Sequence, residues 1–247
     1  MLFFFIALQT FTFGTNGIRN GMACSIEIVA LCLVLESGFK RIVAYFLMLM
    51  AMGVHRSTML PSVAAIATLY VIKDTKNALR FWFASIAISL VAGSTVTNFF
   101  ASLGFDDRMS SYSVDAEEMQ DQFNKTGFRW DFLLYSAFPV AMIWYVTRFR
   151  RFTDKAYTLF ANVYLFCNAF WIMVIRSSFS NRFAYLSWFI YPVVMAMPLL
   201  RMNLWKDQDR KTAIILFFYG AFTFFMFFVY YFGTTGFKGF DQYWWRR

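Results

Sequence analysis

The sequence has few of the residues that interrupt helices or bind transition metals. Only four prolines and twelve glycines occur in 247 residues, with three cysteines and a single histidine. So few helix breakers leave room for long helices. The cysteines lie inside apolar runs and have no Cys/His ligand spacing, which argues against a zinc site and favours a packing role. We therefore expect an all-α protein with no metal and no cofactor.

Acidic residues are also scarce, with 14 Asp and Glu against 23 Lys and Arg and a formal net charge of +9. Such an excess can indicate either nucleic-acid binding or a membrane topology signal. The basic residues lie between apolar runs, so the topology interpretation is preferred and no nucleic-acid partner is expected. Hydrophobic residues make up 60% of the chain, against about 45–50% in soluble domains. This excess indicates a membrane protein.

Several apolar runs approach the length of about 20 residues that a membrane-spanning helix needs. These candidate spans are 22–35, 42–54, 59–72, 81–100, 132–146, 156–175, 183–200 and 212–232. A shorter run, 2–13, precedes them and is too short to span comfortably. It lacks the positive region and the cleavage site of a signal peptide. We interpret it as part of a helix, so that a longer parent would carry further N-terminal residues.

The basic residues alternate between the two sides of the predicted bundle. Thirteen occupy alternate loops, as the positive-inside rule requires of cytoplasmic loops. They are Lys40, Arg41, Lys73, Lys76, Arg80, Arg148, Arg150, Arg151, Lys155, Arg201, Lys206, Arg210 and Lys211. This alternation predicts a polytopic transmembrane helix bundle with about eight to nine spans, in which residues 1–247 form one domain with the C-terminus outside. The one long outer loop, 101–130, is rich in acids, which we expect to be solvated.

Several arginines stand at helix ends on the predicted outer side, against the charge bias. They are Arg19, Arg56, Arg129, Arg176 and Arg182. A guanidinium group presents a fixed fork of donors that matches phosphate bidentately and keeps its proton. Each arginine alone is explained by anchoring of a helix end in the lipid headgroup layer. Their spread over four separate outer segments favours a binding site for an anion such as a diphosphate.

Three other residues are candidates for catalysis. His55, the single histidine, lies two residues before Ser57, and both a structural and a functional role are open. Glu27 lies well inside an apolar run, about two helical turns from Arg19. It either pairs with an arginine or acts as a general base. Asp131, at the membrane boundary, is the second candidate base.

Four short motifs occur in order on the predicted outer side. They are NGIRNGMA at 16–23, HRS at 55–57, TGFRWDFLLYS at 126–136 and SNRFAY at 180–185. Together they resemble the EpsG family of exopolysaccharide and O-antigen polymerases, over a stretch from about residue 14 to about residue 200. Members of that family carry further helices before the first motif, a departure that matches the short run 2–13.

The resemblance implies a glycosyltransferase of the bacterial cytoplasmic (inner) membrane. It would polymerise undecaprenyl-diphosphate-linked oligosaccharide repeats into exopolysaccharide, capsule or O-antigen on the outer face. Arg19, Arg129 and Arg182 would hold the diphosphates and stabilise the departing pyrophosphate, and His55 would orient the acceptor or the leaving group. The expected partners are the lipid-linked oligosaccharide, membrane lipid, a chain-length regulator and a flippase.

Two other functions would use the same cations. A flippase or other transporter of lipid-linked oligosaccharide would also bind diphosphate, but transporters show repeat symmetry and sites near the bilayer midplane. No internal repeat is visible in the sequence. An O-antigen ligase-like transferase would attach finished glycan to another acceptor, and sequence features alone do not separate it from a polymerase.

Overall fold

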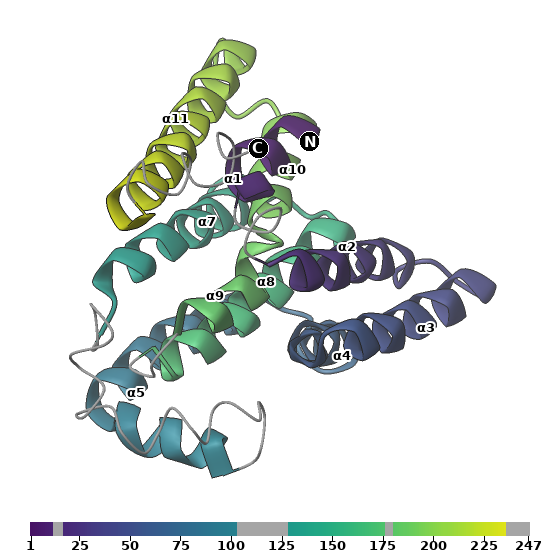
Figure 1. Ribbon diagram of the computed structural model, residues 1–247. Coiled ribbons are helices and arrows are strands. Elements are labelled where there is room, and N and C mark those ends of the chain that lie inside the picture. The colour runs from purple at the N-terminus through teal and green to yellow at the C-terminus, as the bar shows by residue number, and fades with distance from the viewer. Residues whose placement is uncertain (12–16, 103–127, 176–179, 236–247) are drawn as a thin grey trace, which may run out of the picture.

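The computed structural model describes residues 1–11, 17–102, 128–175 and 180–235, and all the regular secondary structure in these residues is helical (Figure 1). The α-helices are α1 (Leu2–Phe11), α2 (Ile18–Leu33), α3 (Phe39–Val54), α4 (Met59–Tyr70), α5 (Thr75–Ser102), α7 (Trp130–Arg148), α8 (Lys155–Met173), α9 (Ser180–Trp188), α10 (Tyr191–Arg201) and α11 (Gln208–Thr235). A 3₁₀ helix, η2 (Arg56–Thr58), separates α3 from α4. The predicted all-α class is confirmed for the described residues.

Helix α8 lies at the centre of the bundle. It contacts α4, α5, α7, α9 and α10, and Tyr164 and Trp171 are among its fully buried side chains. The α8 sequence is apolar around most of its circumference, which is the pattern of a helix buried on all sides. Its start is set by Asp154, whose carboxylate accepts a hydrogen bond from the backbone N–H of Tyr157 at 2.8 Å. This N-cap satisfies one of the unpaired donors of the first turn.

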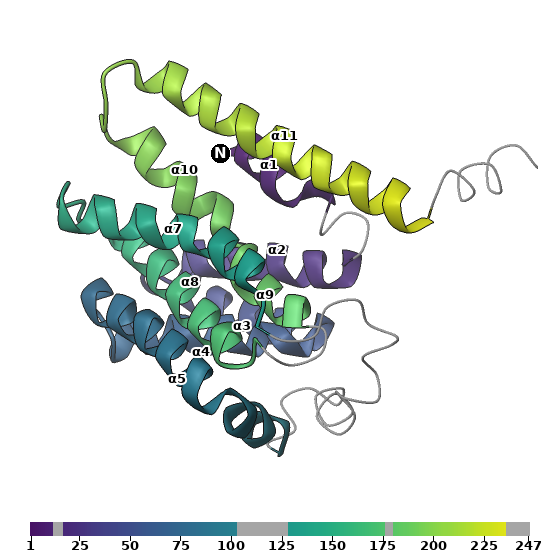
Figure 2. The same ribbon diagram turned by 90° about the vertical axis from the view of Figure 1, so that its left-hand side faces the viewer.

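Helices α2, α3 and α4 form a layer on one side of α8, and α1 and α11 lie together on another (Figures 1 and 2). The turn between α2 and α3 contains Gly38 at φ +60°, a left-handed conformation that glycine adopts without steric cost. On the other side, a Cβ added at Gly220 of α11 would lie 3.9 Å from the Cβ of Ala7. Gly220 therefore faces α1, and a Cβ at this position would make an ordinary van der Waals contact with Ala7.

The expected span 183–200 corresponds to a segment that is long and apolar enough to cross a membrane, Phe183–Arg201, but this segment is not one regular helix. The structure divides it into α9, which ends at Trp188, and α10, which begins at Tyr191. Pro192 stands in the first turn of α10, where a missing N–H is tolerated because it would have no intrahelical acceptor. The chain therefore starts a new helix instead of continuing the old one.

Within the described part of the chain two segments, Lys155–Met173 and Phe183–Arg201, are long and apolar enough to cross a membrane. Both are mostly buried inside the bundle, and two such segments alone are weak support for membrane crossing. Helices α2 and α3 have 16 residues each and α4 has 12, which is less than a full span. Every predicted span matches a described helix or the α9–α10 pair, but the arrangement of eight to nine crossings is not confirmed.

The surface of α3 is apolar where it faces outward. Phe39, Ile42, Phe46 and Leu49 are exposed along one side of the helix, whereas the inward side carries Ala44, Met48 and Ala51. Small residues at helix contacts and large apolar residues outside are typical of helices packed in lipid. The surface of this layer therefore fits apolar surroundings.

The predicted basic loops lie at one end of the bundle. Lys73, Arg148 and Lys155, which belong to two of these loops, line one cavity together with Leu35 from the α2–α3 turn. Arg150 donates from Nη2 to the carbonyl oxygen of Asn203 at 2.7 Å, which adds the α10–α11 connection to the same end. We call this the basic end. Its formation agrees with the predicted alternation of charge.

Candidate active site

The opposite end of the bundle brings together several of the predicted site residues, and we call it the site end. Its central element is η2, which contacts α2, α3, α4 and α9. Arg19 lies in the first turn of α2, Arg56 is exposed on η2, and Arg182 lies in the first turn of α9. Three predicted motifs that are far apart in the sequence are therefore carried by η2 and by two helices that contact it, α2 and α9.

Arg19 links the start of α2 to the end of α3. Its Nε donates a hydrogen bond to the carbonyl oxygen of Val54 at 2.9 Å, and Val54 is the last residue of α3. The last carbonyls of a helix have no intrahelical donor, so this bond caps α3 and holds the guanidinium at the surface. Arginine has five N–H donors, which leaves the exposed Nη groups to bind an anion.

His55 forms the junction between α3 and η2. Its Nδ1 and the hydroxyl of Ser57 lie 2.5 Å apart. Its carbonyl oxygen accepts from the hydroxyl of Thr58 at 2.9 Å and from the backbone N–H of Thr58 at 3.1 Å. Because Ser57 follows His55 by two residues, its hydroxyl reaches the imidazole of His55 and fixes the orientation of the ring. A fixed ring suits both a structural role and the orientation of a substrate.

Glu27 lies deeper, on the side of α2 that faces α4. Its side chain is 0% exposed, and the hydroxyl of Ser62 lies 3.1 Å from Oε1 and 3.0 Å from Oε2. Among the described residues no arginine contacts Glu27, so its partner here is a serine. Arg19 and Glu27 are eight positions apart, which corresponds to a rise of about 12 Å along the helix. Glu27 therefore reaches only a substrate that enters between α2 and α4.

Arg129 and Asp131 pair with each other at the start of α7. Nε and Nη2 of Arg129 donate to the two carboxylate oxygens of Asp131 at 2.9 and 2.7 Å. The guanidinium also lies over the ring of Phe132, 3.8 Å from its centroid. The hydrogen bonds from Arg129 hold the pKa of Asp131 below its ordinary value, which makes Asp131 a weaker base. The geometry favours Asp131 as the residue that positions Arg129.

An aromatic contact joins the start of α7 to α9. The rings of Phe132 and Trp188 meet edge to face with centroids 5.4 Å apart, and Nε1 of Trp188 donates to the hydroxyl of Ser136 at 2.8 Å. Helix α9 therefore lies between Arg129 on one side and η2 on the other. The structure shows no direct contact between Arg19 and Arg129.

Some predicted residues lie outside the described part of the chain. These are Arg176 and, within the predicted outer loop 101–130, residues 103–127. Arg182 is placed on the backbone of α9, but its side chain is not described. Among the described residues no group of three or more His, Cys, Asp or Glu side chains is placed to hold a metal ion.

Two buried polar contacts were not predicted from the sequence. One is the bond between Glu27 and Ser62, which are 35 residues apart. The other is centred on Asn168, which accepts from Nε1 of Trp82 at 2.8 Å and donates to the hydroxyl of Ser187 at 2.9 Å. The available signal was a polar residue inside an apolar run, since such residues face the bundle interior.

Comparison with known proteins agrees with the motifs. The model of the EpsG family matches residues 1–243. No curated protein and no solved structure gives a significant match. EpsG proteins are membrane proteins associated with polysaccharide biosynthesis and polymerase activity, in keeping with the apolar helices described above. Because the match covers almost the entire sequence, the chain belongs to the EpsG family.

Proposed function

We propose that this protein is a glycosyltransferase that polymerises undecaprenyl-diphosphate-linked oligosaccharide repeats. The reaction takes place at the outer face of the bacterial cytoplasmic membrane, which the helix bundle crosses several times. The product is a surface polysaccharide such as exopolysaccharide, capsule or O-antigen. The observation that supports this proposal is the site end, where Arg19 bonds the carbonyl oxygen of Val54, the residue before His55, in a protein of the EpsG family. This end of the bundle lies opposite the basic loops.

The reaction transfers the growing glycan between two lipid carriers. A hydroxyl oxygen at the non-reducing end of the acceptor repeat attacks the anomeric carbon of the donor glycan. The new glycosidic C–O bond forms as the bond between that carbon and the diphosphate oxygen breaks. The hydroxyl proton passes to a base, and undecaprenyl diphosphate leaves with the electron pair of the broken bond.

The arginines supply positive charge where negative charge develops on the leaving diphosphate. Arg19 has exposed Nη groups beyond its bond to Val54. Arg129 is held over Phe132 and uses Nε and Nη2 on Asp131, so its Nη1 side binds phosphate. Arg182 on α9, between them, is assigned the same role. His55, oriented by Ser57, positions the acceptor or the leaving group.

Glu27 is the stronger candidate for the base. Asp131 is committed to Arg129, and its lowered pKa disfavours proton uptake. Glu27 is removed from water, and its hydrogen bond comes from a neutral hydroxyl. In this role the acceptor sugar enters between α2 and α4 to reach the carboxylate.

A surface-glycan gel tests the proposal. A deletion strain is complemented with the wild-type protein, with Arg129→Lys, or with the matched control Arg210→Lys, in which the exchanged residue is exposed near the start of α11 at the basic end. All three proteins are checked for equal membrane levels. Arg129→Lys is expected to give single-repeat product, because an ammonium group keeps the charge but lacks the guanidinium fork. Arg210→Lys is expected to give full-length polymer.

The other outcomes separate the competing functions. Full-length polymer with Arg129→Lys would make Arg129 an anchor in the headgroup layer. Loss of every surface repeat in the deletion strain would indicate a flippase. Accumulation of finished polymer still attached to its lipid carrier would indicate a ligase.

A further inference from the structure

A second region with the features of a binding site lies at the basic end, away from the candidate active site. It is a cavity of about 1080 Å³, and pockets that bind small molecules commonly have about 300–1,000 Å³. The cavity is bounded by the turn after α2, the α4–α5 connection, the start of α5, the end of α7 and the start of α8. In Figure 2 this end is on the left, where α7 finishes and α5 begins.

Positive charge dominates the lining of this cavity. Its basic residues are Lys73, Lys76, Arg80, Arg148 and Lys155, and its acids are Asp74 and Asp154. Five positive and two negative charges leave a net charge of +3. Within the described part of the chain none of the five basic side chains forms an ion pair, although Arg80 donates to the side-chain oxygen of Asn77 at 3.2 Å.

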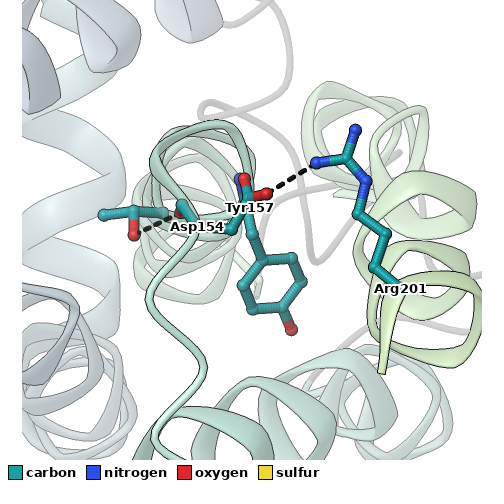
Figure 3. Close-up of polar contacts among 4 residues, drawn as sticks. Asp154, Tyr157 and Arg201 are labelled. Carbon is teal, nitrogen blue, oxygen red and sulfur yellow. Dashed lines mark hydrogen bonds and ion pairs between the residues drawn. The ribbon is translucent and has the colours of Figure 1, made fainter. Parts of the chain in front are cut away.

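The two acids are already engaged in holding helix starts. Asp154 accepts from Nη1 of Arg201 at 2.6 Å through one oxygen and from the backbone N–H of Tyr157 at 2.8 Å through the other (Figure 3). Asp74 accepts from the backbone N–H of Lys76 at 2.9 Å. Neither acid therefore neutralises the cavity cations by direct contact, and an added anion would meet unpaired positive charge.

The wall of the cavity is apolar below this charged rim. On α5, Phe83 follows Arg80 by three residues, and on α7, Trp144 precedes Arg148 by four. Residues three or four apart lie on the same face of a helix. Each helix therefore presents a cation near the basic end, with an exposed aromatic side chain on the same face one turn further from that end. Phe83 is 57% exposed and Trp144 is 48% exposed.

This order of charge and apolar surface matches an amphiphile. A free inorganic anion would use the cations but leave the aromatic walls uncovered. Basic pockets between membrane helices bind anionic lipid headgroups, and the apolar chains of such lipids cover exposed aromatic side chains. We propose that this cavity binds one anionic phospholipid, with its phosphate on Lys76 and Arg148 and its acyl chains along Phe83 and Trp144. This site is independent of the proposed polymerase reaction.

Lipid retention in native mass spectrometry tests this proposal. The full-length protein is reconstituted in nanodiscs containing phosphatidylglycerol and phosphatidylcholine, released, and scored for the lipid that stays bound. The test variant is Lys76→Gln/Arg148→Gln. The control is Lys206→Gln/Arg210→Gln, which removes the same charge from exposed positions at the same end but outside the cavity lining. Each cation near an anionic lipid contributes about a fivefold factor, so the test variant is expected to lose phosphatidylglycerol binding roughly 25-fold.

The wild type and the control are expected to retain phosphatidylglycerol in preference to phosphatidylcholine. Equal retention of the two lipids by the wild type would overturn the proposal, as would an equal loss in the control. Inorganic phosphate and pyrophosphate are added separately to the wild type. Release of the lipid by either anion at equal concentration would assign the cavity to a free anion instead.

A third variant keeps the test decisive if the double substitution prevents folding. Trp144→Ala leaves every cation in place and shortens the apolar wall. It is expected to weaken phosphatidylglycerol retention several-fold without creating any binding of inorganic phosphate. Unchanged lipid retention in Trp144→Ala would show that the acyl chains do not bind along Trp144, and it would overturn the lipid assignment.

Discussion

Removal of the Ser62 hydroxyl tests the buried contact that joins α2 to α4. Ser62 is 2% exposed and Glu27 is 0% exposed, so water cannot replace the lost donor. A buried acceptor left without its partner costs about 1–3 kcal/mol. For a chain of this size about 1 kcal/mol shifts the unfolding midpoint by roughly 2–4 °C. Ser62→Ala is therefore expected to lower the midpoint of thermal unfolding in detergent by about 2–12 °C.

Glu27→Gln separates stability from chemistry at the same contact. The amide has almost the same shape and still offers an oxygen to Ser62. A hydrogen-bonded neutral amide costs less to bury than an ionised carboxylate of the same shape. Loss of a general base reduces the rate by about 10²–10⁴-fold. We therefore expect Glu27→Gln to be at least as stable as the wild type but unable to extend lipid-linked repeats.

The assay is a thermal-shift series on the purified protein, together with the length of polymer made from lipid-linked repeats. Ser37→Ala serves as the matched control, because Ser37 is exposed in the α2–α3 turn and such a change stays within about 0.5 kcal/mol. If Ser62→Ala and the control unfold at the same midpoint, the hydrogen bond between Ser62 and Glu27 makes no measurable contribution to stability. Normal polymer from Glu27→Gln would exclude Glu27 as the base.

Three further predictions concern other polar groups. Asn168→Ala leaves the buried N–H of Trp82 without its acceptor and is expected to lower the free energy of unfolding by about 1–3 kcal/mol. Asn203→Ala, at an exposed position, is the control. Equal unfolding midpoints for the two variants would contradict the stabilising role of the Asn168 hydrogen bonds. Because hydrogen bonds from Arg129 lower the pKa of Asp131, their pair stabilises the fold above the ordinary carboxyl pKa. That contribution is lost as the pH falls below about 4. In Asp131→Asn the unfolding midpoint should therefore depend less on pH below this value than in the wild type. The same pH dependence in both proteins would refute the stabilising role of the Arg129–Asp131 pair. Arg19→Lys is expected to give single-repeat glycan on a gel at normal membrane levels, whereas full-length polymer would reduce Arg19 to a cap of α3.

The helices were predictable because apolar runs bounded by charge are a local property of the sequence. Each predicted run has its counterpart among the described helices, and the alternation of basic loops correctly placed several of them at one end. The break between α9 and α10 was missed although Pro192 was visible. A proline in the first turn of a helix and one inside a longer helix look alike in a sequence.

The contacts within the candidate site were less predictable. The ion pair of Arg129 with Asp131 could have been anticipated, because the two residues are close in the chain at a helix start. The pairing of Glu27 with Ser62 could not, because it depends on how α2 and α4 rotate against each other. An arginine was the more obvious partner by charge, but the arginines lie at the helix ends, two turns away.

The packing of α1 against α10 and α11 has a consequence for how the protein is made. Gln9 near the end of α1 donates to the carbonyl oxygen of Trp188, 179 residues later in the chain. A ribosome adds about 5–20 residues per second, so α1 is synthesised roughly 10–40 s before its partners. During that interval the residues that contact α1 in the folded protein have not yet been synthesised. Truncation before α11 is therefore expected to leave uncovered the side of α1 that packs against α11.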